Sequence, residues 1–154
     1  MKTPPFLVVA DRGSVKAFAV EDTLAHGSMP RLVESFDVSA APERYLERFS
    51  DRAGSFPNGG SNGHGNSIAE RMSLDAEWEV RAFREVGHRI CDLLERYRPE
   101  RWGFAAPSEI NSAILDQLPD EKKHHLTRVV KHDLLKVDAR QLIQQFEAVN
   151  PLAA

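Results

Sequence analysis

The stretch FLVVADRGSVKAFAV, at residues 6–20, decides the fold. It opens with a continuous apolar run over residues 6–10, which closes on the tetrapeptide DRGS at residues 11–14. Residues 15–20 then alternate loosely between apolar and other side chains. Two strand-like runs joined by a turn that contains glycine are typical of a β-hairpin. The stretch therefore predicts the first two strands of a sheet.

A third candidate strand follows the hairpin. Residues 21–30 are turn-rich, and residues 31–38 (RLVESFDV) mix apolar with polar side chains. Such a mixture favours a strand with one face in solvent. Three antiparallel strands in a meander are the simplest arrangement.

The next segment has no persistent hydrophobic periodicity. Residues 54–66 hold five of the nine glycines of the chain and three asparagines. A packed core does not need this composition. We therefore expect a long Gly/Asn-rich loop over residues 50–67.

From about Ile68 the pattern changes to that of a helix. Apolar residues recur mostly three or four positions apart, which places them on one stripe of a helix that ends before Pro99. The opposite side carries charged residues, with Glu77 and Arg81 at a favourable spacing of four. The apolar stripe consists of Met72, Trp78, Ala82, Val86, Ile90, Leu93, Leu94 and Tyr97.

The last third of the chain alternates strands and helices. Residues 101–107 and 126–130 read as strands, residues 120–125 as a short helix, and Ser108 and Asp138 as N-caps of two further helices. Long helical crossovers imply parallel strand pairs. We predict an α/β fold over residues 1–154, a single domain in which helices cover a mixed sheet of about five strands, the first three antiparallel.

Composition limits the functional classes. A net charge of −3 gives no overall attraction to nucleic acid or to an anionic membrane. The single cysteine, Cys91, falls in an apolar helical pattern and is interpreted as a buried structural thiol. The apolar run after the N-terminus is too short for a signal peptide, and no run approaches a membrane span, so a cytoplasmic location is expected.

Several segments, in order and spacing, resemble the bacterial host attachment protein family, described as proteins required for attachment to host cells. They are ADR at residues 10–12, SDRAG at 50–54, the long helix, AAP at 105–107 and VKHDL at 130–134. The family is in turn similar to the middle domain of archaeal and eukaryotic peptide-chain release factors, which has an RNase H-like α/β fold. The resemblance implies this fold here.

In those release factors a Gly-Gly-Gln loop precedes the long helix and enters the ribosomal peptidyl-transferase centre. The equivalent region of this chain is Gly59-Gly60-Ser61, or residues 63–66, and no glutamine follows either glycine group. The resemblance therefore implies a loop that contacts RNA or the ribosome without the residue used for peptidyl-tRNA hydrolysis.

The candidate binding residues cluster around this loop and the first strand. Glycine-rich backbone offers N–H groups that can cradle an anion, and an arginine can bind phosphate with two hydrogen bonds. Asp11 has two interpretations, a turn residue or the first carboxylate of a two-metal nuclease site. The predicted binding residues are Asp11, Arg12, Ser50, Asp51, Arg52, Gly59, Gly60, Ser61, Asn62 and His64.

The chemistry itself is weakly specified. No histidine pair has the spacing of a typical zinc site and no nucleophile elbow is present, so we predict no metal, no cofactor and no catalytic residue. Three hypotheses stay open. The first is a non-enzymatic domain that binds RNA, the ribosome or a protein partner, the second a hydrolase in which Asp11, Asp51 and His64 converge, and the third an oligomeric interaction module whose oligomeric state the sequence does not define.

Overall fold

The computed structural model describes residues 3–38 and 64–152, and for residues 64–75 it describes the backbone alone. The described residues form a five-stranded sheet in the order β3-β2-β1-β4-β5. Strand β1 pairs antiparallel with β2 and parallel with β4, β2 pairs antiparallel with β3, and β4 pairs parallel with β5. The predicted mixed sheet is confirmed. Its strands are β1 (Phe6–Ala10), β2 (Ser14–Thr23), β3 (Gly27–Asp37), β4 (Trp102–Ala105) and β5 (Leu126–Val130).

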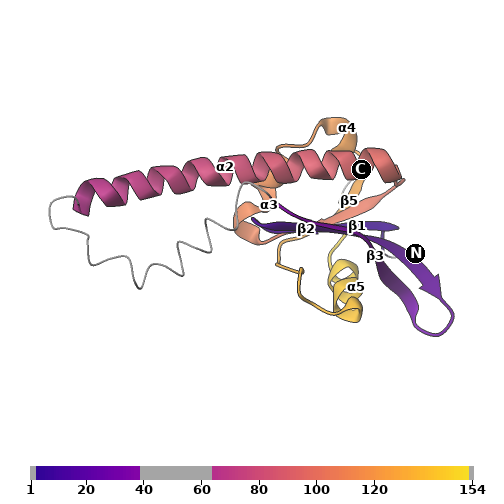
Figure 1. Cartoon of the computed structure of the whole chain (residues 1–154). Coiled ribbons are helices and arrows are strands. Elements are labelled where there is room, and N and C mark those ends of the chain that lie inside the picture. The colour runs from indigo at the N-terminus through magenta and orange to yellow at the C-terminus, as the bar shows by residue number, and fades with distance from the viewer. Residues whose placement is uncertain (1–2, 39–63, 153–154) are drawn as a thin grey trace.

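Helices cover both faces of the sheet (Figure 1). On one face lie α2 (His64–Tyr97), α3 (Ser108–Leu115) and the short α4 (Asp120–Lys123), and on the other lies α5 (Ala139–Ala148). Strand β1 serves both layers because successive side chains point to opposite faces. Phe6 and Val8 pack in the core under α2, whereas Leu7 and Val9 pack in the core over α5.

Helix α2 is the longest element described, and only part of it covers the sheet. Among its described side chains, from residue 76 onward, Ala82 is the first buried one, and buried residues recur at Val86 and Ile90, as the apolar stripe predicts. The N-terminal half extends past the edge of the sheet (Figure 1). At 1.5 Å per residue, its 34 residues span about 50 Å.

The start of α2 corrects the predicted loop. Residues 64–66 are helical, although the loop was expected to run to residue 67 and the helix to begin near Ile68. Glycine and asparagine are weak helix formers. Once a helix exists, however, each added residue gains a backbone hydrogen bond, so a long helix can incorporate weak formers at its end.

The hairpin between β2 and β3 is also longer than predicted. Most of residues 21–30 form strand rather than turn, and the chain reverses only over residues 24–26. Gly27 has a φ of +73°, which glycine adopts without the strain of a β-carbon. Polar pairs across the strands compensate for the lack of apolar alternation. Ser28 Oγ donates to Asp22 Oδ1 at 2.8 Å, and Arg31 pairs with Glu21 at 2.5 Å.

The two predicted N-caps have different outcomes. Asp138 caps α5 as expected, since its Oδ1 accepts from the Gln141 N–H at 2.8 Å. Ser108 is not the N-cap of α3, because it is already helical. The N-cap is the residue before it, Pro107, whose backbone is extended. The Pro107 carbonyl accepts from the N–H groups of Ile110 and Asn111, and Ser108 Oγ donates to Glu109 instead.

Candidate functional site

The carboxyl ends of β1, β4 and β5 lie at one edge of the sheet, and α2 projects past this same edge (Figure 1). In open α/β sheets, ligands bind outside the carboxyl ends of the strands. We call this edge, with the residues that follow the three strands and the N-terminal half of α2, the helix end. It is the candidate functional site.

Asp11 ends β1 and organises the turn into β2. Its Oδ1 accepts hydrogen bonds from the N–H groups of Gly13 at 2.7 Å and Ser14 at 2.8 Å, and its own N–H donates to the Ser14 carbonyl at 3.0 Å. This is the local Asp-to-backbone turn that tightens a hairpin. The interpretation of Asp11 as a turn residue is confirmed.

Arg12 joins the hairpin turn to α2. Its Nε lies 2.7 Å from Oε1 of Glu79, and the two side chains are 35% and 38% exposed. The pair sits where α2 leaves the sheet, since Ala82 is the first buried residue among the described side chains of the helix. Glu79 therefore offsets the charge of Arg12, which the sequence predicted as a binding residue. Nothing in the local sequence marks Glu79 as its partner.

Asn111 is a buried polar residue of the helix end that sequence reasoning missed. The side chain is 1% exposed, and its Nδ2 donates to the carbonyls of Ala106 and Val130, each at 3.1 Å. It thus joins the ends of β4 and β5 to the first turn of α3. Its Oδ1 has no hydrogen-bond partner among the described residues. A lone asparagine between Ile110 and Ile114 was the available signal.

Basic residues and backbone N–H groups meet at this edge. Lys131 and His132 are exposed and directly follow β5, whose last carbonyl accepts from the Ala106 N–H at 3.2 Å. The first turn of α3 begins two residues after Ala106. Helix N-termini and nearby cations favour negatively charged groups. The described part of the helix end is therefore better suited to an anionic or polar partner than to an apolar one.

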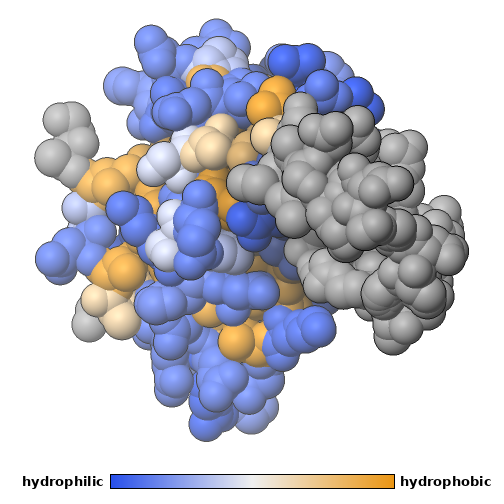
Figure 2. All heavy atoms as spheres, turned by 90° about the vertical axis from the view of Figure 1, so that its left-hand side faces the viewer, coloured by the Kyte–Doolittle hydropathy of each residue, from blue (hydrophilic) through white to orange (hydrophobic). Residues whose placement is uncertain are grey.

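Figure 2 views the molecule from the side on which α2 projects. Over the described residues, hydrophobic side chains reach this surface as separate patches among hydrophilic ones. A broad apolar interface is usually a single larger patch. The visible surface thus agrees with a largely polar contact.

Most of the predicted loop residues lie outside the described part of the chain. This holds for Ser50, Asp51, Arg52, Gly59, Gly60, Ser61 and Asn62. His64 is the first residue of α2, and its side chain is also outside the description. The convergence of Asp11, Asp51 and His64 that a hydrolase requires therefore stays a prediction.

Metal-binding and thiol chemistry have little support in the described ranges 3–38 and 64–152. No group of three or more His, Cys, Asp or Glu side chains there is arranged to hold a metal ion. Cys91 is half-buried on α2 rather than fully buried, and this burial raises the pKa of its thiol, with nearby Lys122 opposing the shift. A raised pKa lowers the thiolate fraction and hence the reactivity of the cysteine.

Comparison with known families gives a direct assignment. The family model described as "Protein required for attachment to host cells" matches residues 6–146, from the first residue of β1 into α5. The chain belongs to this family. The host attachment family match thus covers all five strands and most of α5. No curated protein matches the sequence at a significant level. No helix in the described residues has the length and apolar character needed to cross a membrane.

Two cavities lie away from the helix end. One, of about 280 Å³, is lined by the start of β3 and by α5. The other, of about 570 Å³, lies between the C-terminal end of α2 and α4, with Arg98, Glu100, Lys122 and His125 among its lining residues. Sequence reasoning predicted neither, because each is formed by segments far apart in the chain.

Proposed function

We propose that this host attachment family protein is a non-catalytic binding protein that serves attachment by holding the Gly-rich segment before α2 against a macromolecular partner. The observation that supports the proposal most directly is the projection of α2 past the sheet (Figure 1). Residues 59–62 precede the helix by only a few positions in the sequence, so we assign the contact to this segment.

The geometry of α2 favours presentation over catalysis. From His64 to Ala82, the first buried residue among the side chains described on the helix, the helix rises about 27 Å at 1.5 Å per residue. A catalytic group needs neighbours that position it and exclude water. A contact loop instead needs reach and an accessible surface. The projecting half of α2 supplies reach.

The similarity to release-factor middle domains supports RNA or the ribosome as the partner. The sheet order and the long helix after the antiparallel strands are compatible with that similarity. The loop of this chain lacks the glutamine that follows the glycines in release factors. Binding without peptidyl-tRNA hydrolysis is the function that this combination favours.

The charges on α2 limit where an RNA contact would form. Arg81 lies 3.6 Å from Glu77, and the guanidinium of Arg89 stacks over the Phe36 ring at 5.0 Å. Phosphate binding requires positive charge that acidic neighbours do not offset. The middle of α2 is therefore a poor continuation of an RNA surface. The contact is assigned to the loop residues, including Arg52, and to the exposed Lys131 beside the edge.

An attachment assay tests the biological role. Bacteria that carry a deletion of this gene would be complemented with the parent protein, with a variant lacking residues 59–62, or with Arg52→Ala. We expect both variants to reduce attachment to host cells at unchanged protein level. Arg101→Ala removes the same charge at the exposed residue before β4, at the opposite edge, and is the matched control. Full attachment by the variant that lacks residues 59–62 would contradict the proposal.

A ribosome sedimentation assay tests the partner. Purified protein should co-sediment with ribosomes, and the bound fraction should fall as salt rises because phosphate contacts release counterions. Arg52→Ala and Lys131→Ala should each weaken binding and reduce the salt dependence, whereas Arg101→Ala should not. Absence of ribosome and RNA binding, with attachment still dependent on residues 59–62, would assign the loop to a protein partner.

A further inference from the structure

Leu24 is the most exposed large hydrophobic residue of the described chain. It lies in the three-residue turn between β2 and β3, and its side chain is fully exposed. The hairpin carries it away from the sheet, at the end opposite to the projecting half of α2 (Figure 1). We call this region the hairpin end. A single exposed leucine is ordinary, but this one has beside it a groove that holds two apolar side chains among polar ones.

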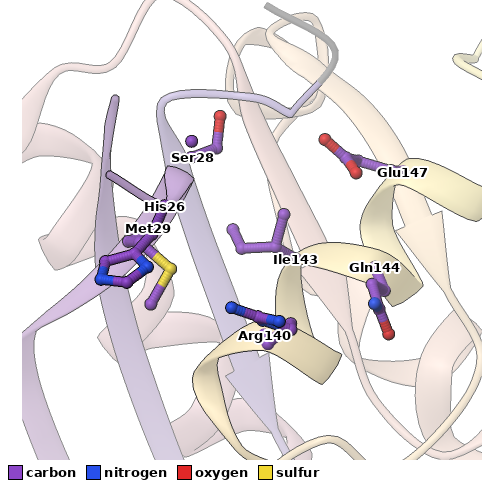
Figure 3. A pocket seen from close by; sticks show the side chains of 8 residues that line it. His26, Ser28, Met29, Arg140, Ile143, Gln144 and Glu147 are labelled. Atoms are coloured by element: carbon purple, nitrogen blue, oxygen red, sulfur yellow. The ribbon is translucent and has the colours of Figure 1, made fainter. Parts of the chain in front are cut away.

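The groove lies between the start of β3 and α5 (Figure 3). Ile143, which is 6% exposed, and the half-buried Met29 supply its apolar surface. Polar side chains from both elements surround them, with His26 on the hairpin and Arg140, Gln144 and Glu147 along α5. Its volume of about 280 Å³ is enough for one aliphatic side chain and part of the backbone that carries it.

The charges at the groove and at the hairpin tip are complementary. Arg140 is exposed and forms no ion pair with any described residue, whereas Glu147 is held by a hydrogen bond from the buried Thr3 at 3.2 Å. On the strand that leads to Leu24, Glu21 is paired with Arg31, whereas the exposed Asp22 accepts a hydrogen bond from Ser28 at Oδ1 alone and keeps its second carboxylate oxygen for a further contact. One surface of the molecule thus carries an apolar projection beside the carboxylate of Asp22, next to a groove that holds two apolar side chains and a cation with no ion-pair partner among the described residues.

We propose that the hairpin end binds a second copy of this chain in a two-fold symmetric dimer. Leu24 of each copy occupies the groove of the other, against Met29 and Ile143, and Asp22 of each copy faces Arg140 of the other. A two-fold interface uses the same patch on both copies, so projection and groove must both belong to that patch. Leu24 is close in sequence to His26 and Met29, which line the groove, so the projection and the groove belong to the same patch.

The contact is small, which sets the expected strength. The tip and the groove comprise fewer residues than the roughly 20–30 per partner of a standard stable interface. The dimer is therefore weak and depends on protein concentration. It forms independently of the partner proposed for the Gly-rich loop, because the hairpin end and the helix end lie at opposite edges of the sheet.

Sedimentation equilibrium of the full chain, up to about 1 mM, tests the dimer against three matched variants. Leu24→Asp should raise the dissociation constant about 100-fold or more, because the symmetric dimer loses two buried leucines, one from each copy. Leu32→Asp and Val80→Asp change side chains that are each 51% exposed, on β3 and α2, and should leave dimerisation unchanged. A parent protein that stays monomeric, or a dimer lost only with Leu32→Asp or Val80→Asp, would overturn the proposal.

A charge exchange tests the arrangement of the two copies. Arg140→Glu places an acidic side chain against Asp22 twice in its own dimer, and Asp22→Lys places a basic side chain against Arg140 twice. Each variant alone should associate about tenfold more weakly than the parent protein, since like charges then face each other. In an equimolar mixture, the glutamate introduced in one variant meets the lysine introduced in the other, and the unchanged Arg140 meets the unchanged Asp22. Association should return on mixing, and failure to return would exclude this geometry.

Discussion

The two ends of the sheet are extended by different means. At the helix end, the projecting element is a helix, and the residues beside it are tied down by hydrogen bonds within the chain, as with Asp11 and Asn111. At the hairpin end, the projecting element is a pair of strands, and the leucine at its tip and the arginine in its groove have no such partners in the described chain. The described residues of the helix end are thus fixed by contacts within the chain. The leucine and the arginine of the hairpin end are available for a contact with another molecule.

The two ends also differ in how far their structure can be predicted from the sequence. Part of the helix end follows from local chemistry, because the turn-forming Asp11 and the apolar stripe of α2 can be recognised from neighbours in the sequence. The hairpin-end groove joins β3 to α5 across more than a hundred residues. Its existence depends on how the sheet brings these elements together. Mutations that act on one end only are therefore the most informative.

The largest effect is expected for Asn111→Asp, which acts at the helix end. A carboxylate there cannot donate to the carbonyls of Ala106 and Val130, and its charge is buried without a partner. We expect a loss of about 3–5 kcal/mol in the free energy of unfolding at neutral pH. Burial should raise the pKa of the new carboxyl in the folded state, so stability should recover as pH falls through that raised value.

Urea unfolding at pH 7.5 and pH 5 would measure this. Asn111→Ala removes the same hydrogen bonds without adding charge, and we expect it to lose about 1–3 kcal/mol with little dependence on pH. Equal losses for the Asp and Ala variants at both pH values would show that the carboxylate reaches solvent, and that the ends of β4 and β5 are less tightly joined than the structure indicates.

Gly103→Ala is expected to have the next largest effect and acts through α5. A β-carbon at Gly103 would lie 2.8 Å from Cε1 of Phe146, closer than these atoms can approach, and 3.1 Å from Cδ2 of Leu7, which is tighter than most such contacts. Because Phe146 is fully buried, its ring has little room to move, and we expect the clash to displace the ring together with α5. Overpacking of this kind costs about 1–3 kcal/mol, measured by thermal or urea unfolding.

The same variant sharpens the comparison of the two ends. A shift of α5 moves Arg140 and Ile143, so Gly103→Ala should weaken dimerisation while leaving ribosome binding unchanged. Adding Phe146→Leu makes room for the new methyl group, and the double variant should lose less stability than the two single losses combined. Additive losses would mean that Phe146 is not what the β-carbon displaces.

Arg98→Gly is expected to stabilise the protein by up to about 1 kcal/mol. Arg98 follows the last residue of α2 with a φ of +43°, and its N–H donates to the Leu94 carbonyl at 2.9 Å. This left-handed conformation is strained for residues with a β-carbon and is natural for glycine at a helix C-terminus. Arg98→Ala keeps the β-carbon and should give no such gain. Melting temperatures that change equally in both variants would refute the strain explanation.

How much could be predicted from the sequence differs between particular residues. The buried strand FLVVA, the Asp11 turn and the Asp138 cap were predicted correctly because each depends on residues within a few positions of one another. The length of the β2–β3 hairpin was missed because pairs such as Asp22 with Ser28 form only once the strands are aligned. Ser108 was assigned as a cap because the effect of the preceding proline was given too little weight.

At the candidate site, the sequence predicted Asp11 and Arg12 but not Glu79 or Asn111. The contacts of these two residues hold the hairpin turn and the strand ends in place. Glu79 is 67 residues from Arg12, and the contact depends on where α2 crosses the hairpin turn. Asn111 contacts Val130, 19 residues away on a neighbouring strand. Both contacts are tertiary. No spacing rule for a helix or strand anticipates them.

The smallest effect is expected for the Arg12–Glu79 pair, and it tests how firmly the helix end is oriented. Both side chains are about one-third exposed, so solvent screens the interaction. A double-mutant cycle with Arg12→Ala and Glu79→Ala should therefore give a coupling of about 0.2–1 kcal/mol that declines with added salt.

The pair lies where α2 leaves the sheet, with about 15 residues of helix beyond it. Each residue adds roughly 1.5 Å to the length of the helix, so even a small change in its direction displaces the N-terminus by several ångströms. A coupling of zero would mean that the packing of α2 on the sheet alone sets the direction of the projecting half. A measurable coupling, together with weaker ribosome binding by Glu79→Ala, would show that this contact sets the direction of the helix and thereby affects ribosome binding.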